Sequence, residues 1–152
     1  GVLMLYNTGS LKHPETQNSI LSYVDAMPYL KRINYSLPLD YAFPNFGWGV
    51  WFRNNAFQAI LHQQDYSDKN LYEQTDSTHY RVIKNHYNEG HWLICGDIIR
   101  KEVSEMVAIE QLKKHLSFSE ATSIIMYHLD ENNLKNLDDY EISTFYSRPA
   151  AE

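Results

Sequence analysis

The sequence predicts an α/β fold in which parallel strands alternate with helices. Three apolar runs, at residues 2–6, 39–46 and 123–129, are each followed at once by polar or aromatic residues. Strands that are buried on both faces of a parallel sheet have such continuous apolar runs, whereas strands with one solvated face alternate. Segments with helical spacing separate the runs, and this order aligns the carboxyl ends of the strands at one edge.

The first strand is expected at residues 2–6, and the turn-forming residues 7–10 end it. A helix is expected from Gln17 to Ile33 because its apolar residues recur at helical spacing, at Ile20, Leu21, Val24, Met27 and Leu30. Thr16 or Asn18 is its expected N-cap. Pro28 removes a backbone donor, so the segment forms either one kinked helix or two short helices.

The second strand is expected at residues 39–46, where Pro44 interrupts regular pairing because proline lacks an N–H group. Two further strand-like runs, 50–53 and 56–61, are joined by Asn54 and Asn55. Asparagine tolerates a positive φ angle, which the tight turn of a two-residue hairpin requires. The sequence therefore predicts a hairpin inserted after the second strand.

The middle of the chain predicts less regular structure. Residues 62–78 are polar and predict a surface loop, and a weak alternation at 80–84 predicts a strand. A second hairpin is expected around Gly96, between the runs 91–95 and 97–101.

Near the C-terminus, Ser104 is the expected N-cap of a helix whose apolar stripe is Met106, Ile109, Leu112 and Leu116. Lys113 and its neighbours suit the dipole at the end of that helix. A short helix is expected after the third strand, near Leu134. Residues 147–152 have little to bury and predict a flexible tail.

Length and charge bound the classes of function. A chain of 152 residues has the size of one domain, which is expected to span residues 1–146. The net charge of -6 repels a nucleic-acid backbone, so no nucleic-acid partner is expected. The apolar runs are far shorter than the roughly 20 residues of a membrane-spanning helix, so no membrane span is expected either.

Neither a cofactor nor a metal is expected. The chain has no glycine-rich phosphate loop and no nucleophile elbow. His86, Glu89 and His91 lie close together in the sequence, but their spacing is not that of a known metal site. Cys95 is the single cysteine, which excludes an internal disulfide, and its apolar context predicts a buried, inert thiol.

Two parts of the sequence resemble a family of uncharacterised bacterial proteins, of the Bacteroides type, that are related to glycoside hydrolases. The first part is residues 37–48 together with Phe52, Arg53 and Asn54 in the hairpin, and the second comprises residues 96–102 and 124–130. The resemblance implies the C-terminal half of a TIM (β/α) barrel, with the hairpin as an insertion. It also implies a carbohydrate partner and a periplasmic or cell-surface lipoprotein.

The candidate site residues lie at the carboxyl ends of the three strands, where a barrel holds its active site. Glycosidic cleavage uses two carboxyl groups, and Asp130 and Glu131 are the catalytic candidates, with a solvated helix cap as the alternative. The expected substrate-binding residues are Tyr6, Asn7, Asn45, Trp48, Tyr127 and His128. Turn formation by the asparagines and core packing by the histidine and the rings are the alternatives.

The expected function is therefore a carbohydrate-active, glycoside-hydrolase-like domain that binds or hydrolyses a glycan at its strand ends. The alternative is a non-catalytic glycan-binding or structural module. The terminal strands of an incomplete barrel leave unpaired backbone groups at their edges. A homodimer that pairs these open edges is therefore also expected.

Overall fold

The computed structural model describes residues 1–31, 35–129, 131–135 and 137–149. The chain forms two compact units. Unit 1 comprises Gly1–Gly9, Asn18–Phe46 and Ser104–Glu152, and unit 2 comprises Ser10–Gln17 and Gly47–Val103. No helix within the described ranges is long and apolar enough to cross a membrane.

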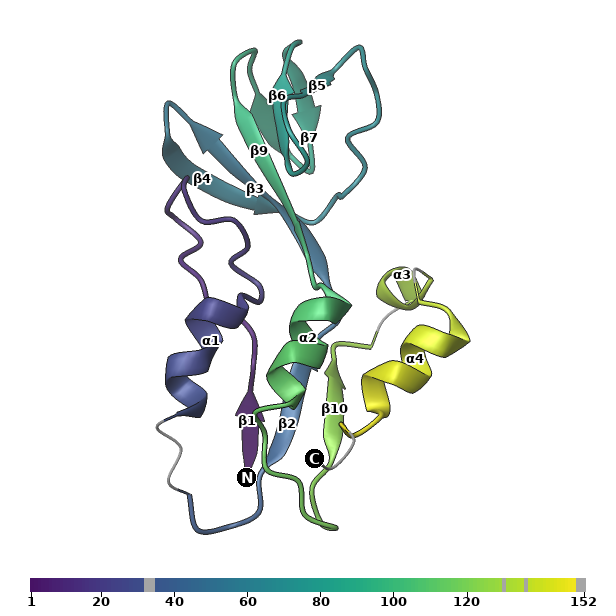
Figure 1. The fold of residues 1–152 in the computed structure, drawn as a ribbon. Coiled ribbons are helices and arrows are strands. Elements are labelled where there is room, and N and C mark those ends of the chain that lie inside the picture. The colour runs from purple at the N-terminus through teal and green to yellow at the C-terminus, as the bar shows by residue number, and fades with distance from the viewer. Residues whose placement is uncertain (32–34, 130, 136, 150–152) are drawn as a thin grey trace. The chain divides into compact units, whose positions relative to one another are not determined.

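Unit 1 contains a three-stranded parallel sheet (Figure 1). Its strands are β1 (Val2–Met4), β2 (Asp40–Pro44) and β10 (Ile124–Tyr127), in the order β1-β2-β10. Leu3 pairs with Tyr41, and Met126 pairs with Phe43. The three apolar runs therefore do form parallel strands, and β1 and β10 are the edges of their sheet.

The helices of unit 1 are α1 (Tyr23–Leu30), α2 (Met106–Lys113), α3 (Glu131–Leu134) and α4 (Asp139–Tyr146). Helix α1 begins later than the apolar spacing predicts, because the Ser22 hydroxyl caps it by accepting the Asp25 N–H. The predicted cap Asn18 instead accepts from the N–H groups of Ile20 and Leu21. The other predicted cap, Ser104, donates to and accepts from the backbone of Phe46.

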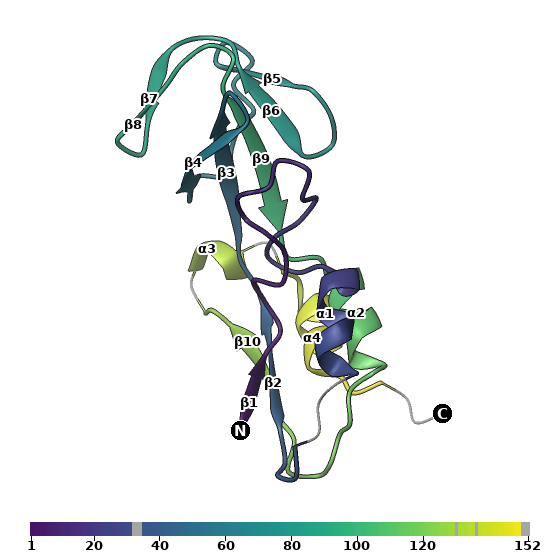
Figure 2. The ribbon, with the colours of Figure 1, turned by 90° about the vertical axis from the view of Figure 1, so that its left-hand side faces the viewer.

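Helices α1, α2 and α4 lie on one side of the parallel sheet (Figure 2). Helix α1 packs on α2, α2 packs on α4, and α4 packs on β10. The core between these helices and the sheet contains Leu5, Ile20, Phe43, Ile109, Leu112 and Phe145, all nearly inaccessible to solvent. In β1, Val2 and Met4, which flank the more buried Leu3, are 52% and 63% exposed.

Unit 2 contains an antiparallel sheet of five strands in the order β4-β3-β9-β6-β5. A separate two-stranded ladder joins β7 to β8. The strands are β3 (Gly47–Arg53), β4 (Ala56–Leu61), β5 (Tyr72–Gln74), β6 (His79–Val82), β7 (His86–Asn88), β8 (His91–Leu93) and β9 (Ile98–Val103).

One of the two predicted hairpins is confirmed. Strands β3 and β4 pair across Asn54 and Asn55, whose φ angles are 51° and 60°. The hairpin around Gly96 is wrong, because β8 pairs with β7 while β9 pairs with β3 and β6. The β7–β8 turn uses Glu89 and Gly90, both with positive φ, so its geometry suits a tight hairpin better than the Gly96 region does.

The predicted half of a TIM barrel is wrong as well. Parallel pairing is confined to β1, β2 and β10, and the other described strands pair antiparallel, without barrel-like alternation of strands and helices. Residues 96–102, which the resemblance assigned to a stage of the barrel, contribute the antiparallel strand β9 between β3 and β6 instead. A continuous apolar run indicates a strand covered on both faces, but it does not distinguish a parallel strand from a central antiparallel one.

The predicted flexible tail also begins in ordered contacts. The Arg148 guanidinium donates to the Thr122 carbonyl at 2.8 Å and lies 5.8 Å from the centre of the Phe118 ring. The N–H of Ser147 donates to the carbonyls of Ser143 and Thr144. Residues 147 and 148 therefore belong to the packed part of unit 1.

Candidate functional site

The carboxyl edge of the parallel sheet brings several predicted site residues together. The N–H of Leu5 donates to the Ala42 carbonyl, so the pairing of β1 with β2 continues toward Tyr6. On the other side of β2, the N–H of Asn45 donates to the Tyr127 carbonyl. Parallel pairing therefore places Tyr6, Asn45 and Tyr127 at the same end of the sheet.

Four rings meet at this edge, and we call Tyr6, Phe46, Tyr127 and His128 the aromatic platform. The rings of Tyr6 and Tyr127 are stacked, with centroids 4.9 Å apart and planes 7° apart. The Phe46 ring meets both edge-on, at 6.2 Å from Tyr6 and 6.1 Å from Tyr127. The His128 ring lies 6.2 Å from Phe46.

Strand alternation explains why these tyrosines lie on the open face of the sheet. In β10, Met126 is buried against the helices, whereas its neighbours Ile125 and Tyr127 are exposed. Tyr6 follows Met4 by two residues and therefore points to the same side as Met4. Tyr127 is 45% exposed, so the platform presents an aromatic face to solvent.

The Tyr6 hydroxyl of the platform is neutral. Burial raises the pKa of the Tyr6 hydroxyl, and the neighbouring Tyr127 hydroxyl raises it further, so Tyr6 stays protonated at physiological pH. The Nδ2 atom of Asn45 is buried and has no hydrogen-bond partner among the described residues. A buried amide of this kind is satisfied when a ligand or a water accepts its proton.

The other predicted site residues occupy different places. Asn7 is exposed and has a φ angle of 55°, which fits its alternative role in a turn. Glu131 is the first residue of α3 and is exposed. Trp48 belongs to β3 of unit 2, where its indole N–H donates to the Glu102 carboxylate at 2.9 Å. Asp130 lies outside the described residues.

Phe46 is a platform residue that the sequence-based prediction missed. It follows the buried Pro44 by two residues, and its aromatic type at a strand end is the same signal that selected Tyr6 and Tyr127. Trp48, the ring that the sequence predicts beside Tyr6 and Tyr127, lies in β3 of unit 2.

His86 and Glu89 of unit 2 form hydrogen bonds with neighbouring protein groups. Nε2 of His86 bonds with the Tyr72 hydroxyl at 2.7 Å, and Nδ1 bonds with the Lys84 carbonyl. The Glu89 carboxylate accepts from the N–H groups of His62 and Gln63. Cys95 is exposed, which corrects the expectation of a buried thiol.

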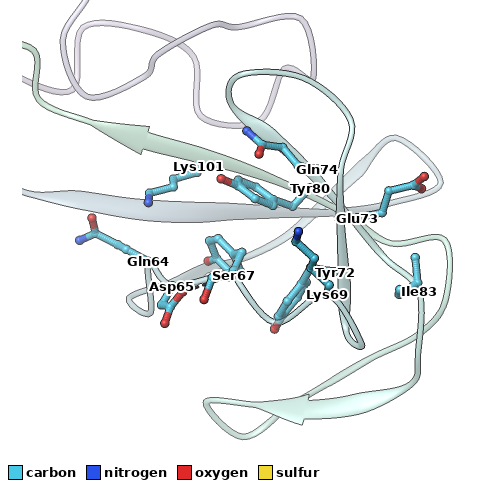
Figure 3. Close-up of a pocket in the computed structure, with 11 residues that line it drawn as sticks. Gln64, Asp65, Ser67, Lys69, Tyr72, Glu73, Gln74, Tyr80, Ile83 and Lys101 are labelled. Atoms are coloured by element: carbon cyan, nitrogen blue, oxygen red, sulfur yellow. Dashed lines mark hydrogen bonds between the residues drawn. The ribbon is translucent and has the colours of Figure 1, made fainter.

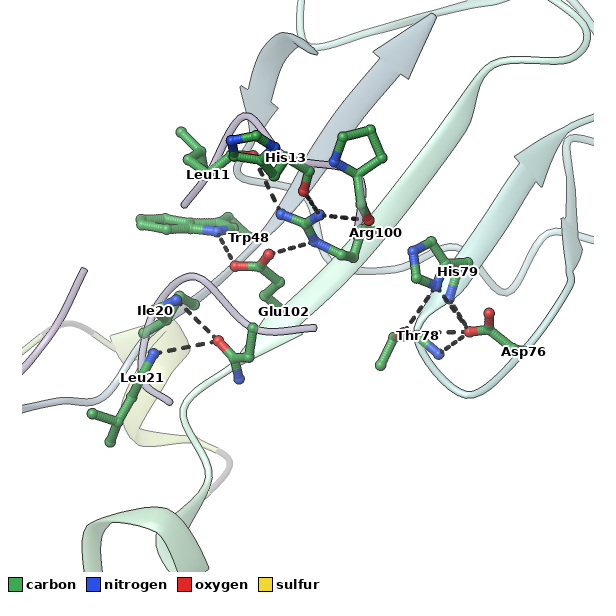
Figure 4. A network of polar contacts seen from close by, with 12 residues as sticks. Leu11, His13, Ile20, Leu21, Trp48, Asp76, Thr78, His79, Arg100 and Glu102 are labelled. Carbon is green, nitrogen blue, oxygen red and sulfur yellow. Dashed lines mark hydrogen bonds and ion pairs between the residues drawn. The ribbon is translucent and has the colours of Figure 1, made fainter. Parts of the chain in front are cut away.

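Unit 2 also holds a buried ion pair (Figure 4). Nε of Arg100 donates to Glu102 at 2.6 Å, and both side chains are fully buried. The guanidinium also donates to the carbonyls of Leu11, His13 and Pro14. These bonds hold the segment 10–17 against β9, so the pair is a structural centre of unit 2.

A second polar cluster in Figure 4 is a turn before β6. The Asp76 carboxylate accepts from the N–H groups of Thr78 and His79, each at 2.8 Å. These bonds lower the pKa of Asp76 to about 2, and the His79 side chain contributes further. The charged carboxylate thus stabilises the turn.

Comparisons with protein families, curated proteins and solved structures found no match to this chain. The resemblance to glycoside-hydrolase-like proteins therefore remains a prediction. What the chain does must be inferred from its own geometry.

Proposed function

We propose that unit 1 binds a carbohydrate at the aromatic platform. The observation that carries this proposal is the stacked pair of Tyr6 and Tyr127 on the open face of the sheet edge, with Tyr127 exposed. Flat rings complement the apolar face of a sugar ring, and tyrosine hydroxyls supply hydrogen bonds beside the stacking surface.

Binding without hydrolysis is the form of this function that the platform supports. Glycosidic cleavage uses two carboxyl groups roughly 5–9.5 Å apart. None of the four platform residues, Tyr6, Phe46, Tyr127 and His128, carries a carboxyl group. A stacking surface requires no tuned carboxylate. The proposal includes the cell-surface or periplasmic location that the resemblance implies, where glycans are encountered.

Affinity electrophoresis tests the glycan proposal. Native gels that contain soluble xylan, galactomannan, pullulan or hydroxyethyl cellulose should retard the protein in at least one case. The Tyr127→Ala substitution should weaken that retardation about tenfold, because the lost stacking is worth about 1.4 kcal/mol.

The matched control for this test is Tyr140→Ala, which removes a highly exposed tyrosine of α4 instead. It should leave the retardation unchanged. Equal retardation of the Tyr127→Ala variant and the parent would remove the platform from binding, and no retardation in any of the four gels would refute the proposal for neutral polysaccharides.

We also propose that unit 1 forms a homodimer through an open edge of its sheet. In the described residues β1 and β10 each pair on one side only, with β2. An edge strand presents unpaired N–H and C=O groups that a second chain can pair with. The exposed Val2 and Met4 side chains on β1 add apolar surface beside that edge.

Light scattering coupled to size-exclusion chromatography tests the dimer. The parent should show twice the monomer mass, and Met4→Lys should shift it to the monomer, because a charge on an edge strand opposes edge pairing. Val24→Lys, on the exposed face of α1, is the matched control and should leave the dimer intact. A parent that is monomeric at every concentration contradicts the proposal.

A further inference from the structure

Unit 2 contains an open pocket of about 670 Å³. It is lined by the connection that follows β4, by β5 and β6, and by Lys101 of β9 (Figure 3). Its volume lies within the range of roughly 300–1,000 Å³ that small-molecule sites occupy. The carbohydrate proposal concerns unit 1, so this pocket raises a separate question.

Three tyrosines form the apolar wall of the pocket. The Tyr66 ring packs against Tyr72 at 5.1 Å and against Tyr80 at 5.2 Å. Tyr66 and Tyr72 are almost fully buried, and their hydroxyls are held in place. The Tyr66 hydroxyl donates to the Gln63 carbonyl, and the Tyr72 hydroxyl bonds with His86 and Asn88. The wall is therefore fixed before any ligand arrives.

Two glycines of β3 make room for this wall. A Cβ atom on Gly49 would collide with the Tyr66 hydroxyl, and a Cβ on Gly47 would lie 2.6 Å from Oε1 of Gln64. Gln64 in turn donates to the Gly47 carbonyl at 2.9 Å. The connection that carries Gln64 and Tyr66 thus rests directly on the backbone of β3, which explains why both positions lack a side chain.

Some charged side chains of the pocket have hydrogen-bond or ion-pair partners within the protein. The carboxylate of Asp65 accepts the Ser67 N–H at 2.9 Å, and bonds with Ser67 lower its pKa. The carboxylate of Glu73 pairs with Arg81 at 3.4 Å. Lys69 and Lys101 also line the pocket, and neither ammonium group has a hydrogen-bond partner among the described residues. Glu73 is paired with Arg81, so the charges left in the pocket are those of Asp65, Lys69 and Lys101, a net of +1, and the Lys101 charge also helps to lower the pKa of Asp65.

The tyrosine wall and the two lysines together suit a ligand that has a ring and a negatively charged substituent. The Tyr80 ring is only partly buried, packs on Tyr66 at the edge of the core cluster, and lines the pocket. A ring lying along the tyrosine wall places a carboxylate within the reach of a flexible lysine side chain. We propose that this pocket binds a six-membered ring that carries a carboxylate, with the ring on Tyr80 and the carboxylate on Lys101.

Nuclear magnetic resonance titration with two carboxylates tests the proposal and separates its two sources. The probes are 4-hydroxybenzoate, which has a flat aromatic ring, and D-glucuronate, which has a sugar ring. Each has a neutral partner of similar shape, 4-hydroxybenzamide and D-glucose. At least one carboxylate should shift the amide signals of Gln74, Tyr80 and Lys101 at roughly 10 mM, a concentration suited to weak millimolar binding.

The substitution Lys101→Met keeps the stem of the side chain and removes its charge. It should weaken binding of the carboxylate about tenfold and leave the weak binding of the neutral partner unchanged. Lys84→Met, an exposed lysine that does not line the pocket, is the matched control and should bind as the parent does.

Two results would overturn this proposal even if Lys101→Met failed to fold. One is that neither carboxylate shifts pocket signals in the parent protein, and the other is that each neutral partner binds as tightly as its carboxylate. If only 4-hydroxybenzoate binds, the ligand is aromatic. If only D-glucuronate binds, it is an acidic sugar. Loss of glycan retardation by Tyr127→Ala would affect neither result, since Tyr127 belongs to unit 1.

Discussion

The Arg100→Met substitution should lower the free energy of unfolding of unit 2 by about 3–5 kcal/mol, which is the usual result of breaking a buried ion pair by removing one partner. Both side chains of the pair are inaccessible to solvent, so the Glu102 carboxylate would be left buried without its cation. The segment 10–17 would also lose its bonds from the guanidinium, at the carbonyls of Leu11, His13 and Pro14.

Urea unfolding followed by tryptophan fluorescence measures this loss, because all three tryptophans, Trp48, Trp51 and Trp92, lie in unit 2. Arg81→Met is the matched control. Arg81 is 52% exposed in its side chain and faces Glu73 at 3.4 Å, so its loss should change the stability by less than about 1 kcal/mol.

A double variant isolates the charge as the cause. Adding Glu102→Gln to Arg100→Met removes the unpaired charge and keeps an acceptor for the Trp48 indole, so the double variant should be more stable than Arg100→Met alone. If Arg100→Met unfolds at the same urea concentration as Arg81→Met, the buried pair is not the structural centre that its geometry indicates.

Replacing Lys113 by methionine should destabilise unit 1 by about 2–4 kcal/mol, because hydrogen bonds from a charged donor in a buried site are among the strongest. The side chain is 1% exposed, and its ammonium donates to Glu110 and to the carbonyls of Thr144 and Ser147. Those carbonyls belong to the C-terminal end of α4, where a positive charge is also favoured by the helix dipole.

Far-ultraviolet circular dichroism during urea unfolding follows unit 1, which contains every helix of the described residues. Lys114→Met is the control, because Lys114 is the exposed neighbour of Lys113 and its side chain makes none of these bonds. Equal destabilisation by the two substitutions would mean that loss of a lysine from the end of α2, and not the contact with α4, sets the effect.

The contacts of Lys113 are an example of what local sequence patterns do not predict. Its position at the end of a predicted helix suggested that it stabilises the dipole of its own helix, α2. The structure shows its charge at the end of α4 instead. The spacing within one helix identifies the apolar stripe of Ile109 and Leu112, but it does not say which other helix covers the residues beside that stripe.

The candidate site was predictable to the extent that it depends on parallel pairing. Tyr6, Asn45, Tyr127 and His128 follow apolar strands, and the shared direction of those strands brings them to one edge. No comparable pattern in the sequence predicts the pocket of unit 2. Tyr66, Tyr72 and Tyr80 are separated by polar residues, and they meet only because their segments fold back onto β3 and β9.

The sequence by itself determined the features that depend on neighbouring residues. The apolar runs of β1, β2 and β10, the turn at Asn54 and Asn55, and the apolar stripe of α2 all follow from side-chain periodicity and backbone preference. Tertiary structure alone decided the partners of these elements. The pairing of β3 with β9 joins residues about fifty positions apart, from Gly47 with Val103 to Phe52 with Ile98, and no local preference encodes such a register. Because of that long-range pairing, the middle of the chain forms an antiparallel sheet in a second unit and not part of a barrel. The free energy of a sheet comes from cross-strand packing, and only the folded chain brings the packed residues into contact.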